Sequence, residues 1–287
     1  MLNIFDNIEK WLKEGLIDAI EEAFLAMFES INRQVGEVAD NIGQSPADFS
    51  PGIFSMIENL STTVIVPIAG MILTFVMTYE LIQMIIEKNN MVDFDTFNIY
   101  KWVFKTVVAV YILTNTFTIV MAVFDMGQHV ISSSAGIISG SLDVDSALSD
   151  LRPRLEAMGV WELMGLWLEV KIVGFCMNIM SAVVFIIVFG RMIEIYLTVS
   201  IAPIPFSTLA NREWSSIGNN YLKSLFAVAF QGFLIMVCVA IYAVLVQGIS
   251  SADSIHAAIW ITMGYTALLC FTLFKTGSLA KSLFAAH

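Results

Sequence analysis

The sequence predicts an all-α protein, a polytopic membrane helical bundle with about five spans. Hydrophobic residues make up 57% of its 287 residues and charged residues only 14%, whereas soluble domains carry about 25% charged residues. The mean hydropathy is +0.79. Several apolar runs also approach the roughly 20 residues that a helix needs to cross a bilayer. We therefore expect lipid to replace water around much of the chain.

Five apolar stretches are long enough to be spans, and more polar segments separate them. The predicted spans are residues 60–86, 103–124, 172–191, 222–246 and 257–274. They divide the chain into an extracytoplasmic amphipathic helix and linker (1–59), the first two spans (60–124), an extracytoplasmic central loop (125–170) and spans three to five with a cytoplasmic C-terminus (171–287).

Residues 1–31 have the apolar periodicity of an amphipathic helix. The apolar residues recur every three or four positions: Phe5, Ile8, Leu12, Leu16, Ile20, Phe24, Met27 and Ile31. Most acidic residues lie off this stripe, whereas a helix anchored on anionic lipid carries a basic polar face. The pattern therefore favours packing on a protein surface, either a partner or the chain's own bundle, over a helix lying flat on lipid.

Two predicted spans carry polar side chains in their interior. The second span contains Thr114, Asn115 and Thr118, and the fourth contains Gln231. Because polar side chains within a membrane usually form hydrogen bonds between helices, we expect them to form a polar face inside the bundle. The lining of a passage is the alternative.

The third span has recognisable residues at both ends. Trp161 and Trp167 precede it, as aromatic residues do at a membrane interface. Arg191 follows Val173 by a length of helix close to one hydrocarbon thickness, so it is expected at the opposite boundary. That position avoids the cost of about 2.5–3.5 kcal/mol of a charge at mid-membrane. Glu194 lies one helical turn later and is expected to pair with Arg191.

The apolar segment 195–209 is short for a span and contains Pro203 and Pro205. Proline removes a backbone donor and ends or kinks a helix. Because irregular backbone is not tolerated facing lipid, we expect a proline-broken re-entrant or interfacial segment buried against protein, with a sixth span as the alternative. A polar turn with Trp214 leads into the fourth span. This region either orders two neighbouring spans or forms a docking face for cytoplasmic partners.

Lysine and arginine determine the expected orientation, because cytoplasmic loops are enriched in them. Basic residues lie between the first two spans, between the third and fourth, and after the fifth, whereas residues 247–256 have none. The N-terminus and the central loop are therefore expected outside the cell membrane and the C-terminus in the cytoplasm.

The residues do not indicate an enzyme, a cofactor or a direct nucleic-acid binder. The net charge is −11, and phosphate binding requires clustered Lys and Arg. Cys176, Cys238 and Cys270 all lie in apolar runs and are interpreted as packed thiols. The sequence has no HExxH, phosphate-loop or CxxC motif, so no catalytic, cofactor-binding or metal-binding residue is predicted.

Three sequence features of the second half accompany the predicted arrangement of spans and loops. They are the run Arg191-x-x-Glu194-x-Tyr196, the segment Ala202-Pro203-Ile204-Pro205, and Trp214 before the fourth span. With them, the sequence resembles the TrbL-like polytopic membrane subunits of conjugative type IV secretion systems, particularly the short versions on mobile elements of Gram-positive bacteria. The resemblance covers most of the chain.

This resemblance implies a channel or scaffold subunit that supports the passage of a DNA–protein substrate across the bacterial cell membrane. The implied partners are further copies in a homo-oligomer, other type IV secretion membrane subunits, cytoplasmic secretion ATPases and membrane lipid. The translocating DNA–protein substrate is implied only as a transient contact. A small-molecule or ion transporter with its site in residues 200–205 is the alternative function.

Overall fold

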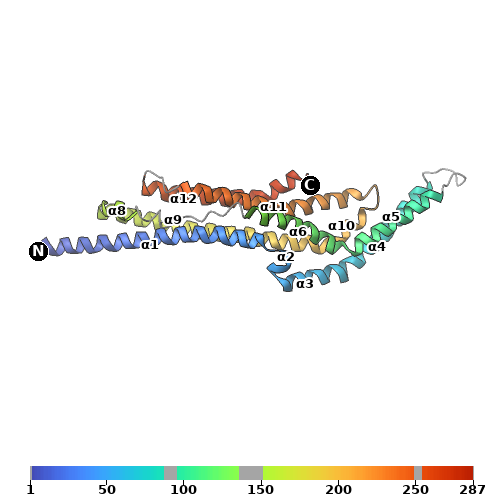
Figure 1. The fold of residues 1–287 in the computed structure, drawn as a ribbon, viewed down its shortest axis with the longest axis horizontal. Helices are drawn as coiled ribbons and strands as arrows, with labels where there is room; N and C mark the ends of the chain where they lie inside the picture. The colour runs from blue at the N-terminus through green and yellow to red at the C-terminus, as the bar shows by residue number, and fades with distance from the viewer. Residues whose placement is uncertain (1, 87–95, 136–150, 249–253, 287) are drawn as a thin grey trace. The chain divides into compact units, whose positions relative to one another are not determined.

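The computed structural model describes residues 2–86, 96–135, 151–248 and 254–286, and the regular elements in these ranges are helices (Figure 1). The helices are α1 (Leu2–Gly43), α2 (Pro46–Phe49), α3 (Pro51–Leu60), α4 (Val66–Ile86), α5 (Thr96–Thr114), α6 (Thr116–Ala135), α8 (Leu151–Glu156), α9 (Val160–Ile201), α10 (Pro203–Thr208), α11 (Ser215–Gln247) and α12 (Ile255–Leu283). A π-helical turn, η1 (Ser61–Ile65), joins α3 to α4. The predicted all-α fold class is confirmed.

Four helices in the described ranges are long and apolar enough to cross a membrane: Pro51–Ile86, Val160–Ile201, Ser215–Gln247 and Ile255–Leu283. A fifth candidate is the pair Phe97–Thr114 and Thr116–Ser134, which is bent by 66° where its helices meet. The chain is therefore a multi-pass membrane protein, and the predicted number of about five spans is confirmed.

The helix of the third span is longer at both ends than the sequence indicated. α9 begins at Val160 and continues to Ile201, so residues 195–201 extend this helix and do not belong to the broken segment. The helix ends at Ile201, two residues before Pro203, because proline has no N–H to continue the hydrogen-bond pattern. Its 42 residues correspond to about 63 Å, which exceeds the ~30 Å hydrocarbon thickness.

The chain folds as two compact units. Unit 1 contains residues 1–42, 133–188 and 235–275, and unit 2 contains residues 43–132, 189–234 and 276–287. α9, α11 and α12 each contribute several residues to both units. Each unit thus combines segments that lie far apart in the sequence.

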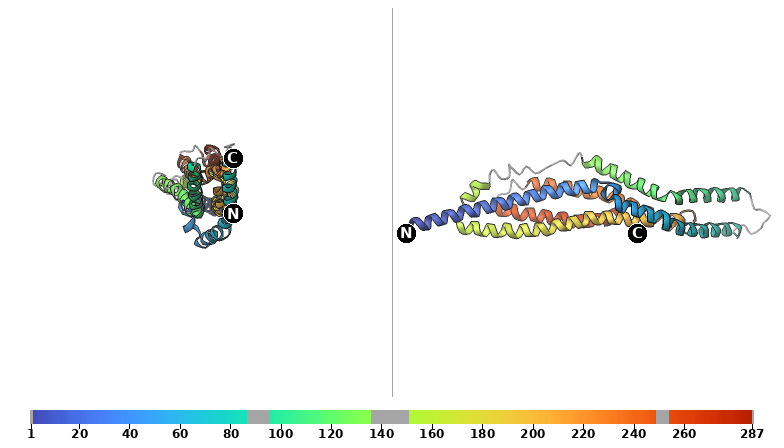
Figure 2. Two further views of the ribbon diagram at one scale, coloured as in Figure 1. Left: turned by 90° about the vertical axis from the view of Figure 1, so that its right-hand side faces the viewer. Right: turned by 90° about the horizontal axis from the view of Figure 1, so that it is seen from below.

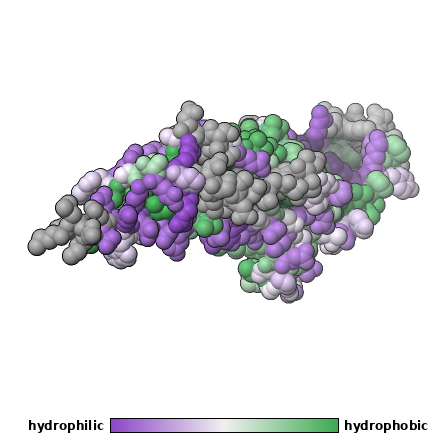
Figure 3. All heavy atoms as spheres, turned by 60° about the vertical axis from the view of Figure 1, so that its left-hand side comes forward, coloured by the Kyte–Doolittle hydropathy of each residue, from purple (hydrophilic) through white to green (hydrophobic). Residues whose placement is uncertain are grey.

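In unit 1, α1 lies lengthwise beside the first part of α9 (Figures 1 and 2). Its inner face is buried and apolar: Ile17, Ile20, Phe24, Met27, Phe28, Ile31, Val38 and Ile42. The predicted amphipathic helix is confirmed, and it continues past residue 31 to Gly43. Hydrophilic side chains cover much of the face around the N-terminal end (Figure 3). Of the expected alternatives, the structure shows packing on the chain's own bundle.

Polar contacts also join α1 to α8 within unit 1. Arg152 donates to Glu21 Oε2 at 2.7 Å and lies 3.4 Å from Asp18 Oδ1, and Lys13 Nζ donates to the carbonyl oxygen of Glu156 at 2.7 Å. The side chains of Arg152 and Asp18 are 52% and 66% exposed and that of Glu21 is 22% exposed, so each of the two ion pairs contributes only about 0–1 kcal/mol.

The core of unit 2 includes close helix contacts that require glycine. A Cβ atom at Gly127 of α6 would lie 2.8 Å from the carbonyl oxygen of Ala229 on α11. A Cβ atom at Gly218 of α11 would lie 2.7 Å from the carbonyl oxygen of Pro205 on α10. Because a backbone atom cannot rotate away as the tip of a side chain can, only glycine allows these approaches.

The polar patch of the second predicted span lies at the bend between α5 and α6. Thr114, Asn115 and Thr116 each donate to the carbonyl oxygen four residues earlier, at 3.0, 2.8 and 2.9 Å, and Thr118 is exposed. We expected Thr114 and Asn115 to form hydrogen bonds between helices, but both bind the backbone carbonyl groups of the preceding turn. Short polar side chains that bind their own helix backbone favour bending, which accounts for the break inside this span.

Candidate functional site

The proline-broken segment is a one-turn helix buried inside unit 2. α10 packs against α4 and α5, and Pro203, Pro205, Phe206, Ser207 and Thr208 are all buried. The two hydroxyl groups donate to carbonyl oxygens three residues earlier, at 2.6 and 2.8 Å, so buried backbone acceptors gain partners. The expected burial against protein is confirmed, whereas the position of the segment relative to the membrane stays a prediction.

Residues 200–205 offer little to a transported solute. Ser200 is buried and its hydroxyl donates to the carbonyl oxygen of Leu197 at 2.8 Å. A cavity beside α10 is lined by residues of α5 together with Phe206, Leu209 and Ala210, which follow this stretch. The geometry therefore does not favour the transporter alternative.

Asn211 organises the turn between α10 and α11, and the sequence analysis missed it. Only 1% of the residue is exposed. Its Oδ1 accepts hydrogen bonds from the backbone N–H groups of Glu213 (2.8 Å) and Trp214 (3.2 Å), and its Nδ2 donates to Glu80 Oε2 at 2.7 Å. An asparagine shortly before a helix start is a known capping signal that could have identified this residue.

Glu80 connects three segments of unit 2. Its Oε1 accepts from Lys105 Nζ on α5 at 2.6 Å, and its Oε2 accepts from Asn211. Beside it, Gln83 Nε2 on α4 donates to Glu213 Oε1 at 2.7 Å. We call these five residues the Glu80 network. It joins α4, α5 and the α10–α11 turn. The basic segment between the first two spans and the one between the third and fourth spans were expected on the same side of the membrane, and the network connects them.

Trp214 packs on α4 directly beside this network. Its ring centroid lies 5.7 Å from that of Phe75 and 6.4 Å from that of Tyr79. Trp102 of α5 donates its indole N–H to the carbonyl oxygen of Met77 at 3.1 Å. Trp214 therefore anchors the α10–α11 turn on α4, which agrees with the interpretation of this region as one that orders neighbouring spans.

Arg191 is buried, with 5% of its surface exposed, and it does not form the predicted ion pair. Glu194 pairs instead with Lys281 of α12, with Oε1 and Nζ 3.2 Å apart. The Arg191 guanidinium lies against Gly232, where a Cβ would come within 2.6 Å of Nη2, and its Nε has no hydrogen-bond partner among the described residues. A buried charge that is not fully paired is costly, and in a membrane protein it marks a candidate functional residue.

Tyr196 joins α9 to the segment before the first span. Its hydroxyl donates to the carbonyl oxygen of Pro46 at 2.6 Å, and Phe49 packs edge-to-face on Phe189 at 5.2 Å. The linker around α2, expected outside the membrane, thus packs beside the part of α9 that surrounds Arg191.

Of the remaining predicted residues, Trp161 and Trp167 belong to unit 1 and Gln231 belongs to unit 2. Trp161 is 82% exposed at the start of α9, which suits an interfacial position, and Trp167 lies beneath Lys171 Nζ at 5.9 Å. Gln231 is buried on α11, 3.2 Å from where a Cβ of Gly277 would lie. The structure therefore does not combine the residues of the predicted polar bundle face into one site.

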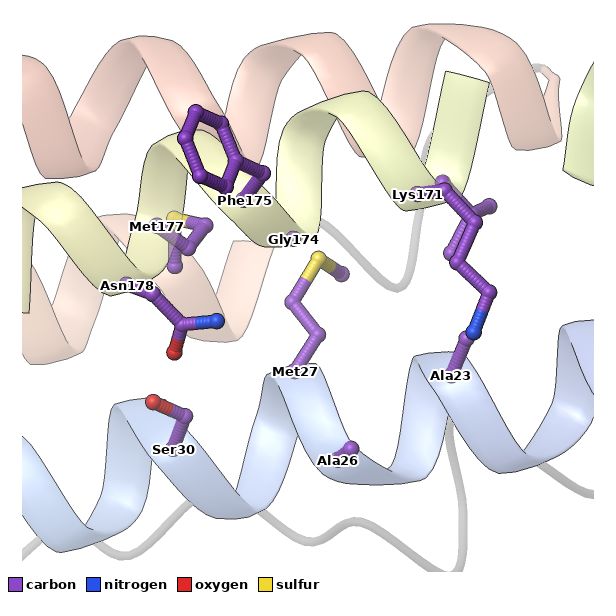
Figure 4. A pocket seen from close by; sticks show the side chains of 10 residues that line it. Ala23, Ala26, Met27, Ser30, Lys171, Gly174, Phe175, Met177 and Asn178 are labelled. Carbon is purple, nitrogen blue, oxygen red and sulfur yellow. The ribbon is translucent and has the colours of Figure 1, made fainter. Parts of the chain in front are cut away.

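A cavity of about 340 Å³ separates α1 from α9 in unit 1 (Figure 4). Across it, Met27 lies opposite Gly174, Ala23 lies opposite Lys171, and Ser30 lies opposite Asn178. Among the described residues, no group of three or more His, Cys, Asp or Glu side chains could hold a metal ion. The three cysteines are free and at least partly buried thiols.

Comparisons with known proteins give one match. The family model described as TrbL/VirB6 plasmid conjugal transfer like protein matches residues 31–203, a range that runs from the middle of α1 to the start of α10. A comparison with curated proteins found no match, and neither did a comparison with solved structures.

Proposed function

The chain belongs to the TrbL/VirB6 plasmid conjugal transfer-like family, and from this membership we propose that it is a channel or scaffold subunit of a conjugative type IV secretion machine. The family places it among the membrane components of conjugal transfer. In this role it would support the passage of a DNA–protein substrate across the cytoplasmic membrane. The family match, over a range that holds three of the candidate spans in whole or in part, is the observation that carries the proposal.

The proposed orientation places the C-terminus in the cytoplasm and α1 outside. In unit 2, Lys105 of α5 meets the α10–α11 turn through Glu80, and Lys281 of α12 meets Glu194. In unit 1, Glu169 Oε2 of α9 lies 2.7 Å from Nδ1 of His256, the second residue of α12. The two contacts of unit 2 join segments that the basic residues assign to the cytoplasmic side. The contact of unit 1 joins segments that they assign to the opposite side.

The linker around α2 and α3 requires its own assignment. Tyr196 binds Pro46 near the end of α9, in unit 2. We therefore propose an extracytoplasmic position only for segments of unit 1 and leave the side of α2 and α3 to experiment. A cysteine in place of the exposed Ser55 reports the side of α3 by labelling with an impermeant maleimide.

The proposed partners follow from exposed apolar surface and from the family. Ile172, Phe175, Ile179 and Ile186 of α9 are exposed to between 48% and 68%, and such a surface is covered by lipid or by another subunit. We propose a homo-oligomer that contacts other secretion membrane subunits and the cytoplasmic ATPases.

Deletion of the gene tests this function. An in-frame deletion in a donor strain is expected to abolish mating, and a plasmid-borne copy is expected to restore it, while uptake of small solutes stays unchanged. A deletion strain that transfers DNA at the wild-type frequency contradicts the proposal. A defect confined to solute uptake would favour a transporter instead.

A further inference from the structure

Two adjoining cavities in unit 2 form a groove between α4, α5 and α10. One has a volume of about 380 Å³ and is polar, with Lys101, Lys105 and Arg212 among its lining residues. The other, about 290 Å³, is apolar, with Val108, Ile112 and Phe206 among its lining residues. Lys105 lines both cavities. The groove is therefore amphipathic along its length, and each half is close to the lower limit of about 300 Å³ for small-ligand sites.

The polar half has a surplus of positive charge. Its charged lining residues are Lys101, Lys105, Arg212, Glu80 and Glu213, three cations against two carboxylates, which gives a net charge of +1. Glu80 is already paired with Lys105, and Glu213 accepts from the neutral Gln83.

Two cations of the polar half remain available to a ligand. Lys101 Nζ lies 4.7 Å from the ring centroid of Phe97. Neither Lys101 nor the exposed Arg212 forms an ion pair with a carboxylate in the part of the chain that the structure describes. Among the described residues, no carboxylate has to be displaced from an ion pair with either cation before an anionic group binds there.

The spacing of the two halves along α5 suits the head group and the acyl chain of a phospholipid. Val108 follows Lys101 by seven residues on α5, which corresponds to about 10 Å of helix. This separation is slightly greater than the thickness of one interfacial layer, about 5–8 Å, so a phosphate at Lys101 leaves Val108 at the level of the acyl chains. Tyr100, which is 68% exposed, directly precedes Lys101, and tyrosine is enriched at the membrane interface. Phe104, which is 71% exposed, lies between the levels of Lys101 and Val108.

We propose that this groove binds one anionic phospholipid, with its phosphate at Lys101 and Arg212 and an acyl chain along Val108 and Ile112. Basic pockets between membrane helices are suited to anionic head groups. The apolar half distinguishes a lipid from a free anion, because inorganic phosphate would leave that half without an occupant. Since α10 forms one wall, bound lipid would also fill the space beside the proline-broken segment. This site is independent of the role in conjugation.

Native mass spectrometry of the full-length protein in detergent tests the site with phosphatidylglycerol and phosphatidylcholine as the two probes. Each cation near an anionic lipid changes affinity about fivefold. We therefore expect phosphatidylglycerol to bind about 25-fold more tightly than phosphatidylcholine. Lys101→Gln and Arg212→Gln are each expected to reduce this preference about fivefold, and the double variant is expected to abolish it.

Three further measurements make the test specific. Lys223→Gln removes an exposed lysine of α11 outside the groove and is expected to leave the preference unchanged. Ala109→Leu fills the apolar half and is expected to weaken both lipids. Millimolar inorganic phosphate is expected not to displace phosphatidylglycerol. Equal binding of the two lipids, an equal effect of Lys101→Gln and Lys223→Gln, or displacement by phosphate would each overturn the proposal.

Discussion

Gly127 and Gly190 offer a matched pair of substitutions, because both lie inside helices of unit 2 and only Gly127 is in close contact. A Cβ at Gly127 would lie 2.8 Å from the carbonyl oxygen of Ala229 and 3.2 Å from its carbonyl carbon, whereas a Cβ at Gly190 would meet nothing within 4 Å. The atoms at Gly127 belong to the backbone of α11. Gly127→Ala must therefore push α6 and α11 apart, and Gly190→Ala requires no adjustment.

The magnitude follows from two opposing terms. Alanine stabilises a helix interior relative to glycine by about 0.5–1 kcal/mol, and both variants gain this. Overpacking costs about 1–3 kcal/mol, and only Gly127→Ala pays it. The difference in unfolding free energy between the variants is therefore about 1–3 kcal/mol. With 2 kcal/mol and about 2–4 °C per kcal/mol, the Tm of Gly127→Ala should lie about 4–8 °C below that of Gly190→Ala.

Thermal unfolding of the two purified variants in the same detergent, followed by tryptophan fluorescence, measures this difference. Size-exclusion chromatography before heating checks that both are monodisperse. Equal Tm values, or a lower Tm for Gly190→Ala, would refute the close contact between α6 and α11 and with it the packing described for unit 2.

Three other substitutions address the candidate site. Arg191→Glu should disrupt the detergent-extracted complex more than Lys281→Arg does, because it reverses a buried charge; size-exclusion profiles of equal size for both variants would count against this. Asn211→Ala should lower the free energy of unfolding by about 1–3 kcal/mol, because it leaves buried hydrogen-bond partners unsatisfied. Asn211→Asp should destabilise the protein at least as much, because it places a second carboxylate beside Glu80. An unchanged Tm for either variant would contradict the Glu80 network. Tyr196→Phe should cost about 1 kcal/mol through the lost hydrogen bond to α2, and thermal unfolding without a shift would show that this bond does not form.

The spans and the proline break could be predicted because both depend on local sequence. Apolar length reports a membrane helix, and Pro203 ends α9 whatever surrounds it. The amphipathic pattern of α1 was likewise readable, although its end was not, because Gln34 at 4% exposure continues the buried face with a polar residue.

The Glu80 network could not be predicted because its members are distant in sequence. Glu80 and Asn211 are separated by 131 positions, and only the packing of α10 on α4 brings them together. The same holds for Lys281, which forms an ion pair with Glu194 from another helix. A spacing of three residues on one helix indicates a possible pair, but a third charge from another helix decides whether that pair forms.

The bend between α5 and α6 is an intermediate case. The polar residues Thr114 and Asn115 were recognised as unusual, and their partners were assigned to other helices. Their side chains are short enough to bind the carbonyl groups of their own helix, and this local option needs no neighbouring helix.

Cysteine labelling in intact cells is the most direct test of the proposal that this multi-pass membrane chain has a cytoplasmic C-terminus. After replacement of the three native cysteines, single cysteines are placed at the exposed Ser254 and Ser282 and treated with a membrane-impermeant maleimide. We predict that Ser254→Cys is labelled in intact cells and that Ser282→Cys is labelled only after lysis. Labelling of Ser282→Cys in intact cells, or recovery of the protein from the soluble fraction, would contradict the account.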